Sequence, residues 1–125
     1  MGMKLPSGKE ISLSDVIRFC YDLSDTDLEV LFKLLKEGEK TVDDISAELG
    51  LSKASISRAL NKLLGLGFIE RRRLMGPASV GRPKYIYATS KERIETKIRR
   101  DMDHCVKIVR EFMGKLLKEE EIISI

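Results

Sequence analysis

The fold is decided by residues 41–87, which read TVDDISAELGLSKASISRALNKLLGLGFIERRRLMGPASVGRPKYIY. Thr41 opens a capping box, a pattern in which the first and fourth residues satisfy each other's backbone N–H groups at the start of a helix. This helix is short, and Gly50 provides the left-handed residue that commonly ends one. A second helix follows at 52–64, with a serine cap and an apolar stripe. The pattern predicts two helices joined by a tight turn.

A β-hairpin is predicted directly after the second helix. Residues 68–74 and 84–88 are strand-like, and the loop between them, 75–83, contains two glycines and two prolines that exclude regular structure. Two short helices followed by a hairpin are typical of a winged helix-turn-helix, in which the second helix enters a DNA major groove. The hairpin loop, called the wing, would reach the DNA backbone or the minor groove.

The flanking segments are predicted to be mainly helical, so the fold class is mainly α (α+β). A short helix is expected around 16–20, a second from Ser24 or Asp25 to near Gly38, and a last one from Ser90 to about Glu120. The first ten residues are expected to form a loose lead-in. Three parts are predicted: an N-terminal segment and short helix at 1–22, a winged helix-turn-helix at 23–89, and a C-terminal dimerisation helix at 90–125.

Positive charge is concentrated where this fold would touch DNA. The chain of 125 residues has a net charge of +3, yet residues 53–84 contain eight Lys or Arg and one acid, Glu70. That window therefore carries +7, and the remaining residues carry −4. A basic patch on a mildly acidic body is typical of phosphate binding, because it attracts the polyanion and releases its counterions.

The open side of helix 52–64 and the hairpin supply the candidate DNA contacts. Arg58 is the expected base reader, since a guanidinium can bond both major-groove acceptors of a guanine. Alternating strand residues face opposite sides, so Arg71 and Arg73 share one side. The alternatives are a solvated helix face and cross-strand pairing of the arginines. The candidate DNA-binding residues are Ser52, Lys53, Ser55, Ser57, Arg58, Asn61, Lys62, Arg71, Arg73, Arg82 and Lys84.

The last helix carries a heptad seam that predicts a homodimer. Its apolar residues recur at steps of four and three, as in helices that pair side by side. An alternative is that the helix breaks near Gly114 and folds back on its own domain. The seam, and hence the candidate dimerisation surface, consists of Ile98, Met102, Cys105, Val109, Phe112 and Leu116.

The sequence contains few signals for disulfide, metal or enzyme chemistry. Cys105 is expected to be a free cysteine that acts as a small buried hydrophobe, and the alternative is redox sensing, with the two copies of Cys105 facing each other across the dimer. Whether a redox signal at Cys20 or Cys105 controls the protein is left open. One histidine and no CxxC exclude a metal site of the usual spacing, and we expect no cofactor and no enzymatic activity. No apolar run approaches the roughly 18 residues that span a membrane, and a cytoplasmic location is expected.

Three stretches resemble a known group of regulators. LSKASISRALNKLLGLGFIERRR (51–73), GRPKYIYATS (81–90) and LSDTDLEVLFKLL (23–35) are similar to archaeal TrmB-like and bacterial MarR-like winged-helix regulators. The resemblance implies a transcriptional regulator that binds double-stranded DNA as a dimer, with 52–64 as recognition helix and 75–83 as wing. Larger TrmB-type proteins have a C-terminal sugar-binding domain, which we expect to be missing here, leaving any small-molecule effector unknown.

Two other functions share part of this pattern. A non-specific, chromatin-like architectural protein would need the same basic patch but would show no preferred DNA sequence. A winged-helix protein-interaction module would have the same fold but no need for a basic recognition face. The basic patch favours DNA binding over the protein-interaction module, and a preferred DNA sequence would distinguish a regulator from the architectural protein.

Overall fold

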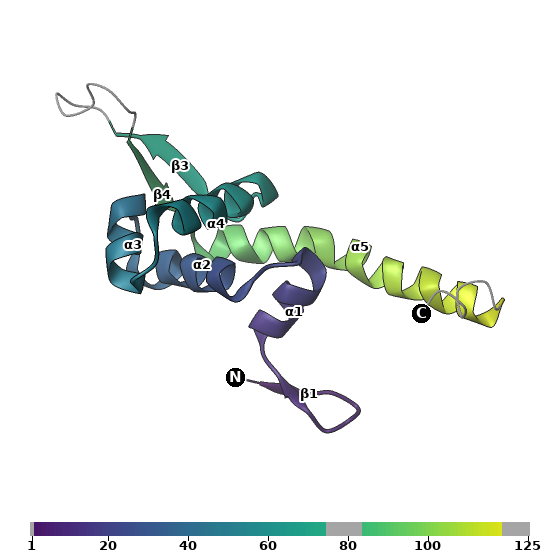
Figure 1. Ribbon diagram of the computed structural model, residues 1–125. Coiled ribbons are helices and arrows are strands. Elements are labelled where there is room, and N and C mark those ends of the chain that lie inside the picture. Colours follow the sequence, from purple (N-terminus) through teal and green to yellow (C-terminus); the bar gives the residue numbers. More distant parts are fainter. Residues whose placement is uncertain (1, 75–83, 119–125) are drawn as a thin grey trace.

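The computed structural model describes residues 2–74 and 84–118 (Figure 1). Within them the chain is mainly helical, with one hairpin in the wing position and a long C-terminal helix, so the predicted winged helix-turn-helix is confirmed. The elements are β1 (Met3–Lys4), β2 (Glu10–Ile11), α1 (Leu13–Tyr21), α2 (Asp25–Glu37), α3 (Val42–Leu49), α4 (Lys53–Leu66), β3 (Glu70–Arg73), β4 (Tyr85–Ala88) and α5 (Lys91–Leu117).

The predicted caps set the start of the central helices. The Thr41 hydroxyl accepts a hydrogen bond from the Asp44 N–H at 3.2 Å, and the Asp44 carboxylate accepts one from the Thr41 N–H at 3.0 Å. Gly50 ends α3 in the left-handed region, with φ of 67°. Helix α4 runs two residues further than expected, through Gly65 to Leu66, because Gly67 rather than Gly65 takes the left-handed cap.

A single apolar core holds these helices together. Helices α2 and α4 pack against each other at its centre, and α3 closes one side with Ile45. Phe68, just before the hairpin, is fully buried. The core residues are Ile17, Leu23, Leu28, Val30, Leu31, Leu34, Ile45, Ile56, Ala59, Leu60, Leu63, Phe68, Ile69, Tyr87 and Ile94.

The hairpin is tied to the helices through its second strand. Strands β3 and β4 are antiparallel, with Glu70 opposite Ala88. Lys40, which precedes α3, forms a bridge with Tyr87, with N–H to carbonyl distances of 3.1 and 2.8 Å. The base of the hairpin is thereby fixed beside the helix-turn-helix. The predicted wing, 75–83, and Arg82 lie outside the described residues.

The N-terminus differs from the prediction of a loose lead-in. Strands β1 and β2 form a two-stranded hairpin that projects from the body next to α1 (Figure 1). Gly8 supports the turn with φ of 89°. Each strand has only two residues and their side chains are mostly exposed, so no alternating apolar pattern marks them in the sequence.

Helix α5 has 27 residues and extends well beyond the body (Figure 1). It continues unbroken through Gly114, which rules out the alternative of a helix that folds back there. Ile94 is buried in the core, whereas every residue from 106 to 118 is exposed. We call residues 106–117 the distal arm. No helix within the described residues is long and apolar enough to cross a membrane.

Candidate nucleic-acid interface

Helix α4 turns an exposed, mostly polar side away from the core. Its buried stripe consists of Ile56, Ala59, Leu60 and Leu63. Ala54, Arg58 and Asn61 follow one another at helical spacing on the opposite side, and all three are exposed. Ser52 and Lys53 are exposed at the N-terminal end, while Ser55 and Ser57 are half-buried at the edges of this side.

Hydrogen bonds order the N-terminal turn of α4. The Ser52 hydroxyl accepts from the Ser55 N–H at 3.1 Å and donates to the Ser55 hydroxyl at 2.9 Å. The Arg58 guanidinium donates to that same Ser55 hydroxyl at 3.3 Å. These bonds draw Arg58 towards the helix N-terminus, where free backbone N–H groups and the helix dipole favour an anion.

Sequence reasoning missed two residues at this end. The Asp43 carboxylate, at the start of α3, lies 3.1 Å from the Lys53 ammonium, and both side chains are largely exposed. A carboxylate therefore borders the basic patch, and Lys53 is paired with it. Ala54 was missed because it has no polar atom, although its position four residues before Arg58 identifies the side it occupies. Its methyl group is suited to contact a thymine methyl in a major groove.

Lys62 makes contacts within its own chain that the sequence did not indicate. Its ammonium donates to the Asp22 carbonyl at 2.5 Å and lies 3.3 Å from the Asp27 carboxylate, which is almost fully buried. Lys62 follows Arg58 by four positions, on the same side of α4, and its side chain is 41% exposed, so it is its contacts with Asp22 and Asp27 that set it apart. Lys62 fastens the α1–α2 link, so we leave it out of the proposed DNA interface.

The hairpin presents its cations on two sides, as the strand alternation predicts. The Arg71 guanidinium stacks over the Tyr85 ring, 4.2 Å from its centroid. Arg72 instead pairs with Glu39 at 3.0 Å. Arg71, Arg73 and Lys84 are all exposed; Arg71 and Arg73 belong to β3, and Lys84 directly precedes β4.

The predicted dimer seam divides into two halves with different surroundings. Ile98 packs against the core of its own chain, and Met102 is half-buried. Val109, Phe112 and Leu116 are 43, 55 and 52% exposed along the distal arm. The heptad spacing is the same along the whole predicted seam. Only the half of the seam that lies on the distal arm lacks an apolar partner within the described part of the chain.

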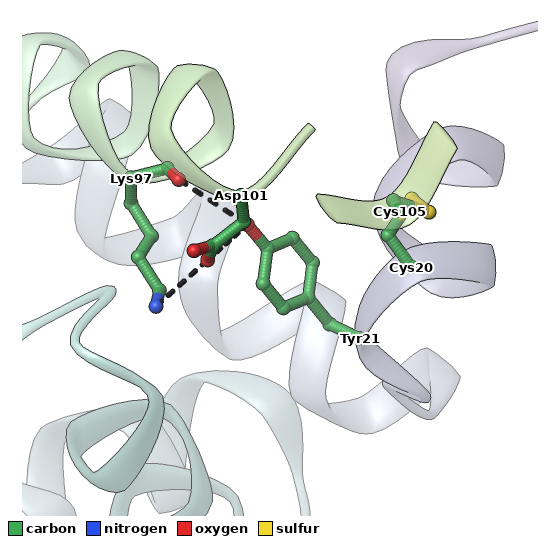
Figure 2. The surroundings of a disulfide bond; sticks show 5 residues. All are labelled: Cys20, Tyr21, Lys97, Asp101 and Cys105. Carbon is green, nitrogen blue, oxygen red and sulfur yellow. Dashed lines mark hydrogen bonds and ion pairs between the residues drawn. A yellow bond between two sulfur atoms is a disulfide. The ribbon is translucent and has the colours of Figure 1, made fainter. Parts of the chain in front are cut away.

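The expectation that Cys105 is a free cysteine is wrong. Cys20 of α1 and Cys105 of α5 form a disulfide within one chain, with Cα atoms 6.0 Å apart (Figure 2). Cys105 therefore faces α1 of its own chain rather than its copy in a second chain. In the described segments, no three His, Cys, Asp or Glu side chains are grouped so as to hold a metal ion.

A short helix, a tight turn, a second helix with an exposed basic side, and an adjoining basic hairpin define the class of winged-helix DNA-binding proteins. Residues 17–92 match the family described as sugar-specific transcriptional regulator TrmB. The chain belongs to this family of DNA-binding transcriptional regulators.

Known proteins similar to the chain come mainly from archaea. A possible transcriptional regulator from Methanosarcina mazei has a TM-score of 0.71 and 27% identity over 97% of this chain and 98% of its own. A structure from Sulfolobus tokodaii has a TM-score of 0.66 and 34% identity, with coverage of 80 and 93%. An uncharacterised Methanocaldococcus jannaschii protein is 27% identical over 106 residues, which is 84% of this chain and 86% of that protein.

Proposed function

We propose that the protein is a sequence-specific transcriptional regulator that binds double-stranded DNA as a homodimer. Helix α4 enters the major groove, and the wing, 75–83, follows the backbone or the minor groove. One observation carries this proposal: the outward side of the N-terminal half of α4 is exposed, polar and basic, and lies directly opposite the buried stripe. A transcriptional regulator acts where the DNA is, so we propose a cytoplasmic location.

Different residues of α4 are proposed to contact the bases and the phosphates. Arg58 is the proposed guanine reader, with Asn61 one turn further along and Ala54 one turn before it. Ser52 and the helix N-terminus lie where a phosphate would approach. The hairpin cations, including Arg71 and Arg82, would bind phosphates and so contribute affinity without discriminating between sequences.

The distal arm is the proposed contact between two copies. Seven large apolar side chains are between 41 and 86% exposed there: Val106, Ile108, Val109, Phe112, Met113, Leu116 and Leu117. A contiguous apolar surface of this kind commonly marks an interface. A two-fold pair formed through the arms would present two recognition helices, which matches the palindromic half-sites that helix-turn-helix dimers read.

Selection of duplexes from a random-sequence pool tests this function directly. We expect a preferred sequence with two related half-sites, and a dimer by light scattering at micromolar concentration. Arg58→Ala should weaken binding to the selected duplex by about 1–3 kcal/mol and change binding to unrelated DNA far less. The matched control is Arg99→Ala, which removes an exposed arginine of α5 that pairs only at the surface with Glu95.

The alternatives give different results in the same experiment. An architectural DNA-binding protein would bind all duplexes alike, and Arg58→Ala would then weaken them equally. A protein-interaction module would bind no duplex at physiological salt. Either outcome would reject sequence-specific regulation.

A further inference from the structure

The root of the distal arm is fastened at a single joint between α1 and α5. Before Cys105, α5 packs on the body through Ile94 and Ile98. After Cys105, every described residue of the helix is exposed. The disulfide to Cys20 is therefore the last attachment of α5 to the body before the arm begins (Figure 2).

A second, polar attachment lies one helical turn earlier. The Tyr21 hydroxyl donates to the Asp101 carboxylate at 2.7 Å, and the Lys97 ammonium lies 2.8 Å from the same carboxylate (Figure 2). Burial, followed by the hydrogen bond and charge of Asp101, raises the pKa of Tyr21 above its usual value. The phenol is protonated at neutral pH in any case, and the raised pKa keeps it a hydrogen-bond donor further into the alkaline range. The joint combines one covalent and one non-covalent fastening.

The covalent part of this joint is accessible to chemistry. Both cysteines are half-buried rather than enclosed, so a small thiolate can reach a sulfur. Disulfides inside the cells of mesophiles are uncommon, and they are usually transient and used in catalysis or redox sensing, whereas intracellular proteins of hyperthermophilic archaea are rich in disulfides. A stable structural cross-link is therefore the alternative, and its resistance to an excess of dithiol would distinguish it.

We propose that Cys20 and Cys105 form a redox-active site whose reduction frees the arm to pivot and so weakens binding to two DNA half-sites. The co-reactant class is a dithiol reductant. One of its thiolates attacks a protein sulfur and forms a mixed disulfide, and the other cysteine leaves as a thiolate that takes up a proton. The second thiol of the reductant then closes its own disulfide and releases the remaining cysteine. Two electrons and two protons pass to the protein.

The expected effect is on geometry rather than on the DNA-reading surface. With the disulfide closed, the arm leaves the body in one direction, and the two recognition helices of a dimer have a fixed separation. With two free thiols, only Tyr21–Asp101 and apolar packing hold the joint, so the arm can pivot. Linked binding to two half-sites depends on this geometry, whereas binding to one half-site does not. This inference rests on the dimeric function proposed above.

The test compares oxidised and reduced wild-type protein on two probes. One probe is the two-half-site duplex selected from the random pool by the oxidised protein, and the other keeps one half-site and scrambles its neighbour. We expect reduction by excess dithiothreitol to weaken binding to the first probe by about tenfold. Binding to the second probe should change by less than about twofold. Circular dichroism of the reduced protein checks that it remains folded.

Variants separate thiol chemistry from simple loosening of the joint. Cys20→Ser and Cys105→Ser should behave like the reduced protein under both conditions. Tyr21→Phe loosens the same joint without touching a sulfur, so it should still respond to reduction.

Each remaining outcome has a definite meaning. Equal binding of both redox states to the two-half-site duplex, or a disulfide that excess dithiol leaves intact, would overturn the redox site alone. The absence of any selected sequence, or a monomer by light scattering in the oxidised state, would instead overturn the proposed function on which this inference rests.

Discussion

Reduction of the disulfide should also lower the stability of the whole domain. Cys20 and Cys105 are 85 positions apart in the chain, so the bond closes a loop that spans most of the described residues. In the chain-entropy treatment, cross-linking a loop of that length stabilises the folded state by about 4.5 kcal/mol at 25 °C. For a domain of this size we expect reduction to lower the midpoint of thermal unfolding by about 15 °C.

Urea unfolding followed by circular dichroism, with and without a phosphine reductant, measures this effect. Because the cross-link acts mainly by restricting the unfolded chain, reduction should also expand the unfolded state and increase the slope m. The Cys20→Ser/Cys105→Ser double variant should match the reduced protein and ignore the reductant. Equal urea midpoints for the oxidised and the reduced wild type would refute the reasoning. They would mean that opening the cross-link adds no conformational entropy to the unfolded chain.

Three further predictions concern individual side chains. Asp43→Asn should strengthen DNA binding up to about fivefold in a titration at fixed salt. The reason is that Lys53 would become available to phosphate, and an exposed ion pair of this kind is worth about 0.2–1 kcal/mol. Weaker binding of the variant would contradict this prediction. Phe112→Glu should raise the dimer dissociation constant more than about tenfold in sedimentation. The ring is 55% exposed in one chain, so in the proposed dimer it would be buried against the partner, and a glutamate there would lose that burial. The circular dichroism spectrum should be unchanged, and an unaltered dimer would reject the arm as the interface. Hydrogen bonds from the Thr41 N–H and then its hydroxyl lower the pKa of Asp44, so its contribution to stability is present above the ordinary value of 3.8 and is lost as the pH falls through the lower folded value. Asp44→Asn should therefore flatten the acid limb of urea stability measured between pH 5 and 2, and identical limbs would exclude this cap as a cause.

The helix-turn-helix could be predicted from the sequence because its signals are local. The capping box at Thr41, the glycine at 50 and the serine cap at 52 act within a few residues, and the structure uses each of them. Hydrophobic periodicity likewise identified the buried side of α4, and with it the outward position of Arg58. The end of α4 was misjudged because two glycines compete for the cap, and helical geometry alone does not decide between 65 and 67.

Features that depend on distant partners could not be predicted in this way. Nothing near Lys62 indicates that the α1–α2 link would take its ammonium, so its positive charge looked available to DNA. The pairing of Cys20 with Cys105 requires α1 to lie against α5, which no local pattern specifies. The heptad of α5 predicts an apolar stripe, yet periodicity is the same whether the partner is the domain's own core or a second chain.

Helix α5 is one continuous helix that runs from the hairpin to the distal arm. It begins beside the hairpin, where the Thr89 hydroxyl donates to the Phe68 carbonyl at 2.7 Å and Ser90 caps the first turn. It then passes the joint with α1 and continues without a break into the distal arm. In the proposed dimer, a rotation of the distal arm about this joint would displace the recognition helix of the second copy. The displacement would grow with the distance between that helix and the joint. If two copies pair through the distal arm as proposed, the half-site separation that the dimer can span would be set at Cys105, far from the proposed DNA-reading residues. Substitutions at this joint should then alter the preferred spacing before they alter the preferred bases.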